Sequence, residues 1–136
     1  PEARHPDPRA AAELARDACF MAGVRNLPNV IGEPHRPRKL LYALAYQENA
    51  PQPTMVLDIT AQMERKLEAI FAYGSQFGGK TSMGDVFGGG SRPLREQILA
   101  HHAHYGSLIR KPFGEPYWTR ETVEVGDLVN LAVNSL

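Results

Sequence analysis

The first residues whose side chains could take part in a reaction lie near the beginning of the chain, in the stretch "RHPDP". Arg4, His5 and Asp7 stand directly before an alanine-rich helical pattern. A helix N-terminus carries a partial positive charge that favours anions and carboxylates. A carboxylate beside an imidazole fixes its tautomer and favours its charged form. His5 and Asp7 therefore suit proton transfer. The alternative is that Asp7 only caps the helix and His5 is a surface residue.

A second cluster of ionisable residues lies in the stretch "HHAHY". His101 and His104 are one helical turn apart, as metal ligands on a helix can be. No cysteine or acidic residue follows at ligand spacing. The alternative is a core-facing His101 flanked by two solvated histidines. Tyr105 lies on the same apolar face, where its phenol needs a polar partner.

A glycine-rich stretch has the spacing of a phosphate-binding loop. The matching residues are Gly74, Gly79, Lys80 and Thr81. Such a loop should follow a strand and open a helix. Here a helical pattern precedes the stretch and more glycines follow it, so the context disfavours a nucleotide site.

Composition narrows the classes of function. The 136 residues include 43% apolar and 22% charged residues, with 15 basic side chains balancing 15 acidic ones. This balance predicts neither a nucleic-acid partner nor an anionic membrane surface. No apolar run reaches the length of a membrane span. A single cysteine, Cys19, fits a reducing compartment, so we expect a cytoplasmic protein.

The chain length fits one domain over residues 1–136. Because the sequence begins at Pro1, we expect this domain to be a piece of a longer polypeptide. No internal repeat is visible in the sequence.

The first predicted element is a helix over residues 9–22. Asp7 is a good N-cap residue, Pro8 suits the first helical position and Gly23 suits the stop. Apolar residues recur at steps of three and four, which gives the helix one apolar face. That face consists of Ala11, Leu14, Ala15, Ala18 and Met21 or Ala22. Residues 26–38, rich in proline, predict a loop.

The remaining pattern alternates strands and helices. We predict strands over 39–46 and 54–59, then a helix capped by Asp58 or Thr60 and ending near Tyr73. Its expected buried residues are Met63, Leu67, Ile70 and Phe71.

A glycine loop over 74–93, a helix over 93–108 and a strand over 117–125 complete the chain. The stripe of the last helix is Leu94, Ile98, His101, Tyr105 and Leu108, with Gly106 as a possible stop. The order of the elements predicts an α/β layered domain.

Several collinear stretches together resemble a known family. They are "RHPDPRAAAELARDACFMAGVRNLP", "GEPHRPRKLLYALAY", "VLDITAQMERKLEAIFAYGSQF", "HYGSLIRKPFGEPYW" and "VGDLVNL". They resemble the C-terminal portion of the LmbE/PIG-L zinc deacetylases, above all the bacillithiol biosynthesis branch, which removes acetate from N-acetylglucosaminyl malate. The resemblance implies the C-terminal part of a Rossmann-like three-layer α/β/α fold, in a protein that forms oligomers.

The resemblance also implies a zinc site, from which this sequence departs. The family holds Zn²⁺ with a His and an Asp of an "AHPDD"-type motif, which also supplies the general base, and with the second His of "HPDH". The chain has "HPDP", so Pro8 stands at that last ligand position, and "AHPDD" is absent. His5 matches the histidine that stabilises the oxyanion or protonates the leaving amine, and Asp7 matches the residue that orients it.

Two functional hypotheses follow from these observations. In the first, the chain is a fragment of a zinc N-deacetylase whose missing N-terminal half supplies the metal ligands, and it is inactive alone. Its catalytic residues are His5 and Asp7, and its substrate-binding residues are Arg4, Tyr105 and Gln76. In the second, it is a non-catalytic, deacetylase-like structural or interaction subunit. We expect a homo-oligomer or a complex with the missing half, and no partner among nucleic acids or membranes.

Overall fold

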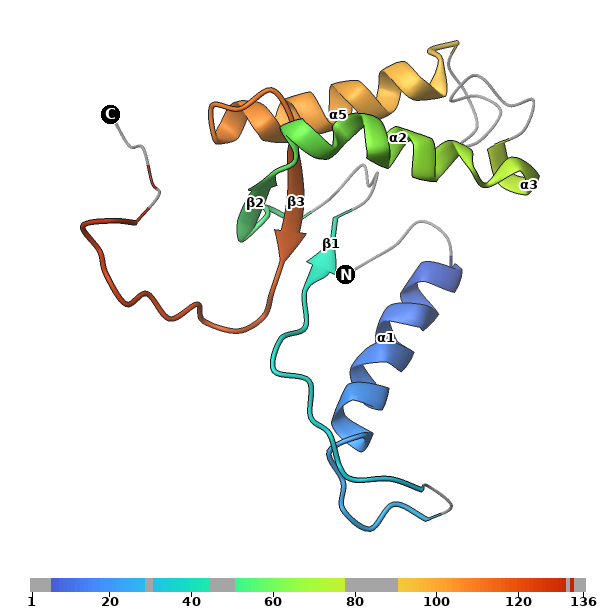
Figure 1. Ribbon diagram of the computed structural model, residues 1–136, viewed down its shortest axis with the longest axis vertical. Coiled ribbons are helices and arrows are strands. Elements are labelled where there is room, and N and C mark those ends of the chain that lie inside the picture. Colours follow the sequence, from blue (N-terminus) through green and yellow to red (C-terminus); the bar gives the residue numbers. More distant parts are fainter. Residues whose placement is uncertain (1–5, 29–30, 45–50, 78–90, 132, 134–136) are drawn as a thin grey trace. The chain divides into compact units, whose positions relative to one another are not determined.

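The computed structural model describes residues 6–28, 31–44, 51–77, 91–131 and 133 (Figure 1). The chain divides into two compact units. The first unit contains Pro1–Thr54 and Tyr117–Thr122, and the second contains Met55–Pro116 and Val123–Leu136. The fold is mixed α/β, in agreement with the predicted class.

The first unit begins with the predicted N-terminal helix. Helix α1 spans Pro6–Met21 and ends just before Gly23. After the predicted proline-rich loop, the short strand β1 spans Tyr42–Ala43. Only two residues of the expected strand over 39–46 pair, and positions 45–46 lie outside the described residues.

The second unit contains the remaining helices. Strand β2 spans Met55–Asp58 and leads through a 3-10 turn, η1 (Thr60–Gln62), into helix α2 (Met63–Phe71). The short helix α3 spans Gly74–Phe77, where the sequence predicted only a loop. Helix α5 spans Leu94–Leu108, close to its predicted bounds, and strand β3 spans Gly114–Trp118.

The strands form a three-stranded sheet in the order β1-β3-β2. β1 and β3 are antiparallel, with Tyr42 opposite Trp118 and Ala43 opposite Tyr117. The last strand was predicted too late in the sequence, over 117–125. In the structure, the strand after α5 begins earlier, at Gly114, and residues 119–131 form no strand.

The apolar core lies mostly in the second unit. Among the described residues, the buried apolar side chains there are Ile59, Met63, Leu67, Leu94, Ile98 and Pro116. This confirms Met63 and Leu67 on the buried side of α2, whereas the prediction for Phe71 was wrong because its side chain is 39% exposed. Figure 1 shows α2 and α5 running alongside each other, and Arg95 of α5 bonds both carboxylate oxygens of Glu64 of α2.

The buried row of α5 differs from the predicted stripe. Leu94, Ile98, His102 and Gly106 are buried, at a constant step of four residues. His101 and Tyr105 are half-buried, and Leu108 is 59% exposed. Residues four apart lie on one side of a helix, as do residues at alternating steps of three and four, so either pattern could form the buried face. The structure buries the residues at the constant step of four.

Gly106 does not end the helix, contrary to the prediction. A Cβ atom at this position would lie 2.6 Å from the carbonyl oxygen of Lys111 and 2.8 Å from the Cα of Phe113. The chain turns back here through a hydrogen bond from the N–H of Lys111 to the carbonyl of Gly106. Glycine therefore permits a close backbone approach between α5 and the start of β3.

The first unit buries little apolar surface. Leu44 is its buried large apolar residue among those described, and α1 contains no buried residue. Leu14 and Phe20 of α1 are 71% and 62% exposed. The predicted apolar face of α1 thus lies open.

In the part of the chain that the structure describes, every helix is too short or too polar to cross a lipid bilayer.

Candidate functional site

The candidate site begins in the first turn of α1. The helix starts at Pro6, so Asp7 and Pro8 lie inside the first turn, and the prediction of Asp7 as the N-cap was wrong. N–H groups of a first turn have no intrahelical acceptor, so the prolines there cost no hydrogen bond. The side chain of Asp7 is exposed near the positive end of the helix dipole.

Arg4 and His5 are the two residues expected to act beside Asp7. Arg4 and His5 lie outside the described residues, as do Lys80 and Thr81 of the glycine-rich stretch. The structure therefore brings Asp7 and Pro8 together in one turn and leaves the predicted contact of Asp7 with His5 as a prediction.

The donor set in the described residues does not fit a zinc ion with three protein ligands. Among those residues, no three His, Cys, Asp or Glu side chains gather closely enough to hold a metal. Pro8 stands where the resemblance implies a histidine ligand, and its side chain is a hydrocarbon ring. Zinc sites need nitrogen, sulfur or oxygen donors.

The remaining predicted site residues belong to the second unit. Tyr105 is half-buried on α5, with its ring centroid 5.0 Å from that of His101 and 4.9 Å from that of His104. Gln76 is exposed on α3, and its backbone N–H bonds the carbonyl of Tyr73. These contacts are local in the sequence. Tyr105 and Gln76 belong to the second unit, whereas Asp7 belongs to the first.

The buried histidine of α5 is His102, so the prediction of a core-facing His101 with two solvated histidines beside it was wrong. Its ring is 4% exposed and its Nδ1 lies 2.9 Å from the carbonyl oxygen of Gly114. A carbonyl only accepts hydrogen bonds, so the neutral ring carries its proton on Nδ1. The row of steps of four from Leu94 to Gly106 was the sequence signal that identifies this residue.

Burial lowers the pKa of His102 below its ordinary 6.5, and the nearby Lys66 lowers it further. The hydrogen bond to Gly114 and the charge of Glu115 act in the opposite direction. Desolvation is the largest cause, so His102 is neutral in the folded protein at neutral pH.

An ion pair and a groove lie beside this histidine in the second unit. The ammonium of Lys66 bonds the carboxylate of Glu115, and both side chains are about a quarter exposed, at 26% and 23%. They form part of an open groove of about 380 Å³. The groove is lined by Ile59, Gln62, Arg65, Lys66, Ala69 and Glu115. The pairing of Lys66 with Glu115 neutralises much of the charge of its wall.

The entrance to α2 is fixed by a local hydrogen-bond pair. Asp58 accepts bonds from the N–H of Thr60 at 3.0 Å and from its hydroxyl at 2.7 Å. These bonds hold the pKa of Asp58 below its ordinary value. The cap position of η1 is Ile59 and that of α2 is Gln62, so Asp58 and Thr60 do not occupy the predicted cap position of α2.

The comparisons with known proteins place the fold in a wider context. No family model matches the chain. Its mixed α/β structure is similar to the crystal structure of the conserved protein TT1542 from Thermus thermophilus. The TM-score is 0.73 and the sequence identity is 27%. The match covers 91% of this chain and 50% of TT1542, so the chain spans about half the length of that protein.

Proposed function

We propose that this chain is one half of a deacetylase-like domain of the LmbE/PIG-L type. The observation that carries the proposal is the match of 91% of the chain to 50% of TT1542, which indicates a unit of a larger fold. The collinear sequence stretches, above all "RHPDP" at the entrance of α1, support the deacetylase class. In this proposal the two units belong to the C-terminal part of a Rossmann-like three-layer domain.

The proposed substrate is an N-acetylglucosaminyl conjugate of the kind used in cytoplasmic bacillithiol biosynthesis. His5 stabilises the oxyanion or protonates the leaving amine, and Asp7 orients its imidazole, as general acid-base chemistry requires. Arg4, Tyr105 and Gln76 bind the conjugate. Half-burial of Tyr105 keeps its phenol near the surface, where a sugar hydroxyl can reach it.

Hydrolysis of an amide at neutral pH needs a metal-activated water and a base. Because the donors described do not fit a zinc site, we propose that this chain alone does not supply that water. The complementary half of the domain then supplies the ligands and the base.

A hydrolysis assay tests this proposal directly. The full chain is incubated with N-acetylglucosaminyl malate and Zn²⁺, and acetate release is measured. We expect no zinc-dependent release above that of a zinc-treated Asp7→Asn variant, which lacks the orienting carboxylate. Robust turnover with stoichiometric zinc that the Asp7→Asn variant loses would contradict the proposed division of the domain.

A second candidate function is a non-catalytic structural or interaction subunit with the same deacetylase-like fold. The observation that favours it is the exposure of large apolar side chains, including Leu14 at 71%, Leu128 at 78% and Val129 at 91%. Burial of such side chains gains about 1.5–3 kcal/mol each. A partner chain or a second copy that covered them would gain this free energy.

A further inference from the structure

We propose that the first unit contains a binding pocket for a small oxyanion, a phosphate or carboxylate group. The pocket has a volume of about 60 Å³. It is lined by Arg9, Ala12, Glu13, Arg16, Tyr42 and Arg120. These residues come from α1, from β1 and from the segment after β3. The pocket does not depend on the deacetylase proposal, because none of its residues is assigned a role there.

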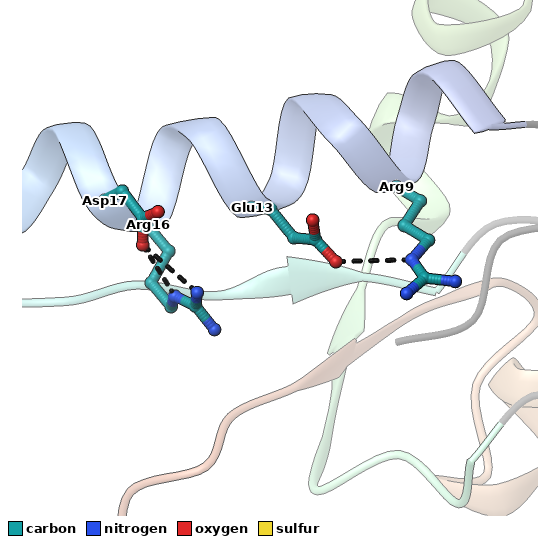
Figure 2. Close-up of polar contacts among 4 residues, drawn as sticks. All are labelled: Arg9, Glu13, Arg16 and Asp17. Carbon is teal, nitrogen blue, oxygen red and sulfur yellow. Dashed lines mark hydrogen bonds and ion pairs between the residues drawn. The ribbon is translucent and has the colours of Figure 1, made fainter.

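The helical repeat brings the charged residues of α1 together. Arg9, Glu13 and Arg16 are spaced by four and three residues, so they share one side of the helix. Figure 2 shows their side chains projecting from the same side. The Nε of Arg9 lies 3.2 Å from Glu13, and the Nε of Arg16 lies 3.1 Å from Asp17.

These ion pairs leave donors available on the same guanidinium groups. A guanidinium has five N–H donors. The contact of Arg9 with Glu13 uses its Nε, so its terminal nitrogens remain for another acceptor. Arg16 contacts Asp17 through Nε and one terminal nitrogen, which leaves the other terminal nitrogen.

Arg120 and Tyr42 are positioned by aromatic contacts. The guanidinium carbon of Arg120 lies 5.8 Å from the ring centroid of Trp118. The ring of Trp118 lies 5.6 Å from that of Tyr42. A cation over an aromatic face is held there by the ring quadrupole. These contacts place a third guanidinium and a phenol at the pocket.

The charge of the lining favours an anion. Three arginines and one carboxylate, that of Glu13, line the cavity. Asp17 pairs with Arg16, so the arginines of this region outnumber the carboxylates by one. Guanidinium groups bind phosphate and carboxylate oxygens through paired, charge-assisted hydrogen bonds.

The size of the pocket fits a small group. A volume of 60 Å³ accommodates about four to six water-sized atoms, at roughly 10–15 Å³ each. The four oxygen atoms of one phosphate, or the two of a carboxylate with neighbouring hydroxyl groups, fit within this volume. A nucleotide base or a sugar ring does not fit inside, so the larger part of any ligand must lie outside the pocket.

The test is a titration of the full chain with inorganic phosphate and, in parallel, with succinate. Binding is followed through the Nε–H resonances of the arginine side chains at constant ionic strength. We expect saturable shifts for one or both anions, and at least tenfold weaker binding in Arg9→Gln and Arg120→Gln variants. An Arg9→Lys variant, which keeps the charge and loses the planar fork, should also bind more weakly.

The matched control is Arg95→Gln, an exposed arginine of the second unit that pairs with Glu64. Its binding should equal that of the unmodified chain, and the thermal midpoints of all variants should agree. Saturation with phosphate alone assigns a phosphate ligand, and saturation with succinate alone assigns a carboxylate. Shifts that do not saturate, or that weaken equally in Arg95→Gln, would overturn the proposal.

Discussion

The buried imidazole of His102 has two consequences at the scale of a single residue. Its Nδ1–H bonds the carbonyl of Gly114, which ties the middle of α5 to the first residue of β3. Its burial also makes the charged form unfavourable, so protonation and folding are linked. Neutral His102 is therefore part of the packing of the second unit rather than a surface histidine.

We predict that the free energy of unfolding decreases as the pH falls below 6.5. The folded pKa of His102 lies below the unfolded value of 6.5, so the unfolded chain binds the proton more readily. The stabilisation is complete above 6.5 and is lost as the pH falls towards the folded pKa. Urea unfolding at several pH values measures this decrease.

Two variants identify the residue responsible for this pH dependence. His102→Gln should weaken the dependence, because the titrating group is gone. His104→Gln removes an exposed histidine of the same helix and should leave the dependence unchanged. An unchanged slope in His102→Gln would assign the effect to another group.

At the scale of the elements, the crossing of α5 and β3 depends on a pair of glycines. A Cβ at Gly106 would lie 2.6 Å from the Lys111 carbonyl, and a Cβ at Gly114 would lie 2.6 Å from the Cγ1 of Val56. Real Cβ contacts are essentially never this short, so the neighbouring atoms would have to move. The close approach lets His102 reach the backbone of β3.

We predict that Gly106→Ala destabilises the protein by about 1–3 kcal/mol. Alanine is favoured over glycine inside a helix by about 1 kcal/mol, but overpacking against backbone atoms outweighs this gain. Thermal and urea unfolding measure the change. Gly126→Ala is the matched control, because nothing lies within 4 Å of its added Cβ. Equal stabilities of the two variants would show that the crossing tolerates a methyl group.

The periodicity of the sequence predicted α1, α2, α5 and β2 close to their observed bounds. It predicted β1 to be longer than it is and placed the last strand too late in the sequence, because strand pairing depends on the partner strand and not on local propensity. It also missed His102. The apolar residues of α5 fit two patterns, one with alternating steps of three and four residues and one with a constant step of four. The close backbone contact at Gly106 places the second pattern on the buried side.

The candidate site was less predictable than the elements. The sequence located Asp7 and Pro8 at the start of a helix, and the structure confirms that position while starting the helix at Pro6. The arginine pocket could not be predicted, because Arg120 follows a strand more than a hundred residues along the chain from Arg9. Such a site is formed by topology and not by sequence spacing.

At the scale of the whole molecule, the exposed apolar side chains predict association. The open face of α1 carries Leu14, and its substitution costs the isolated chain little because the side chain is exposed. We predict that the full chain associates with itself or with another chain, and that Leu14→Asp weakens this association. Sedimentation velocity measures it, with Glu13→Gln on the same helix as the control.

A well-folded monomer with a cooperative thermal transition would contradict this prediction. So would an association that both substitutions weaken equally, since the contact would then not depend on the apolar face of α1.

The most direct test of the central claim is the zinc affinity of the full chain, measured by equilibrium dialysis and anomalous X-ray scattering. We predict no stoichiometric zinc in the natural sequence, and none in Pro8→His or Pro8→Ala, because one added histidine is only one of the three protein ligands that a catalytic zinc needs. A fully occupied zinc ion bonded only to atoms of the unmodified chain would contradict it.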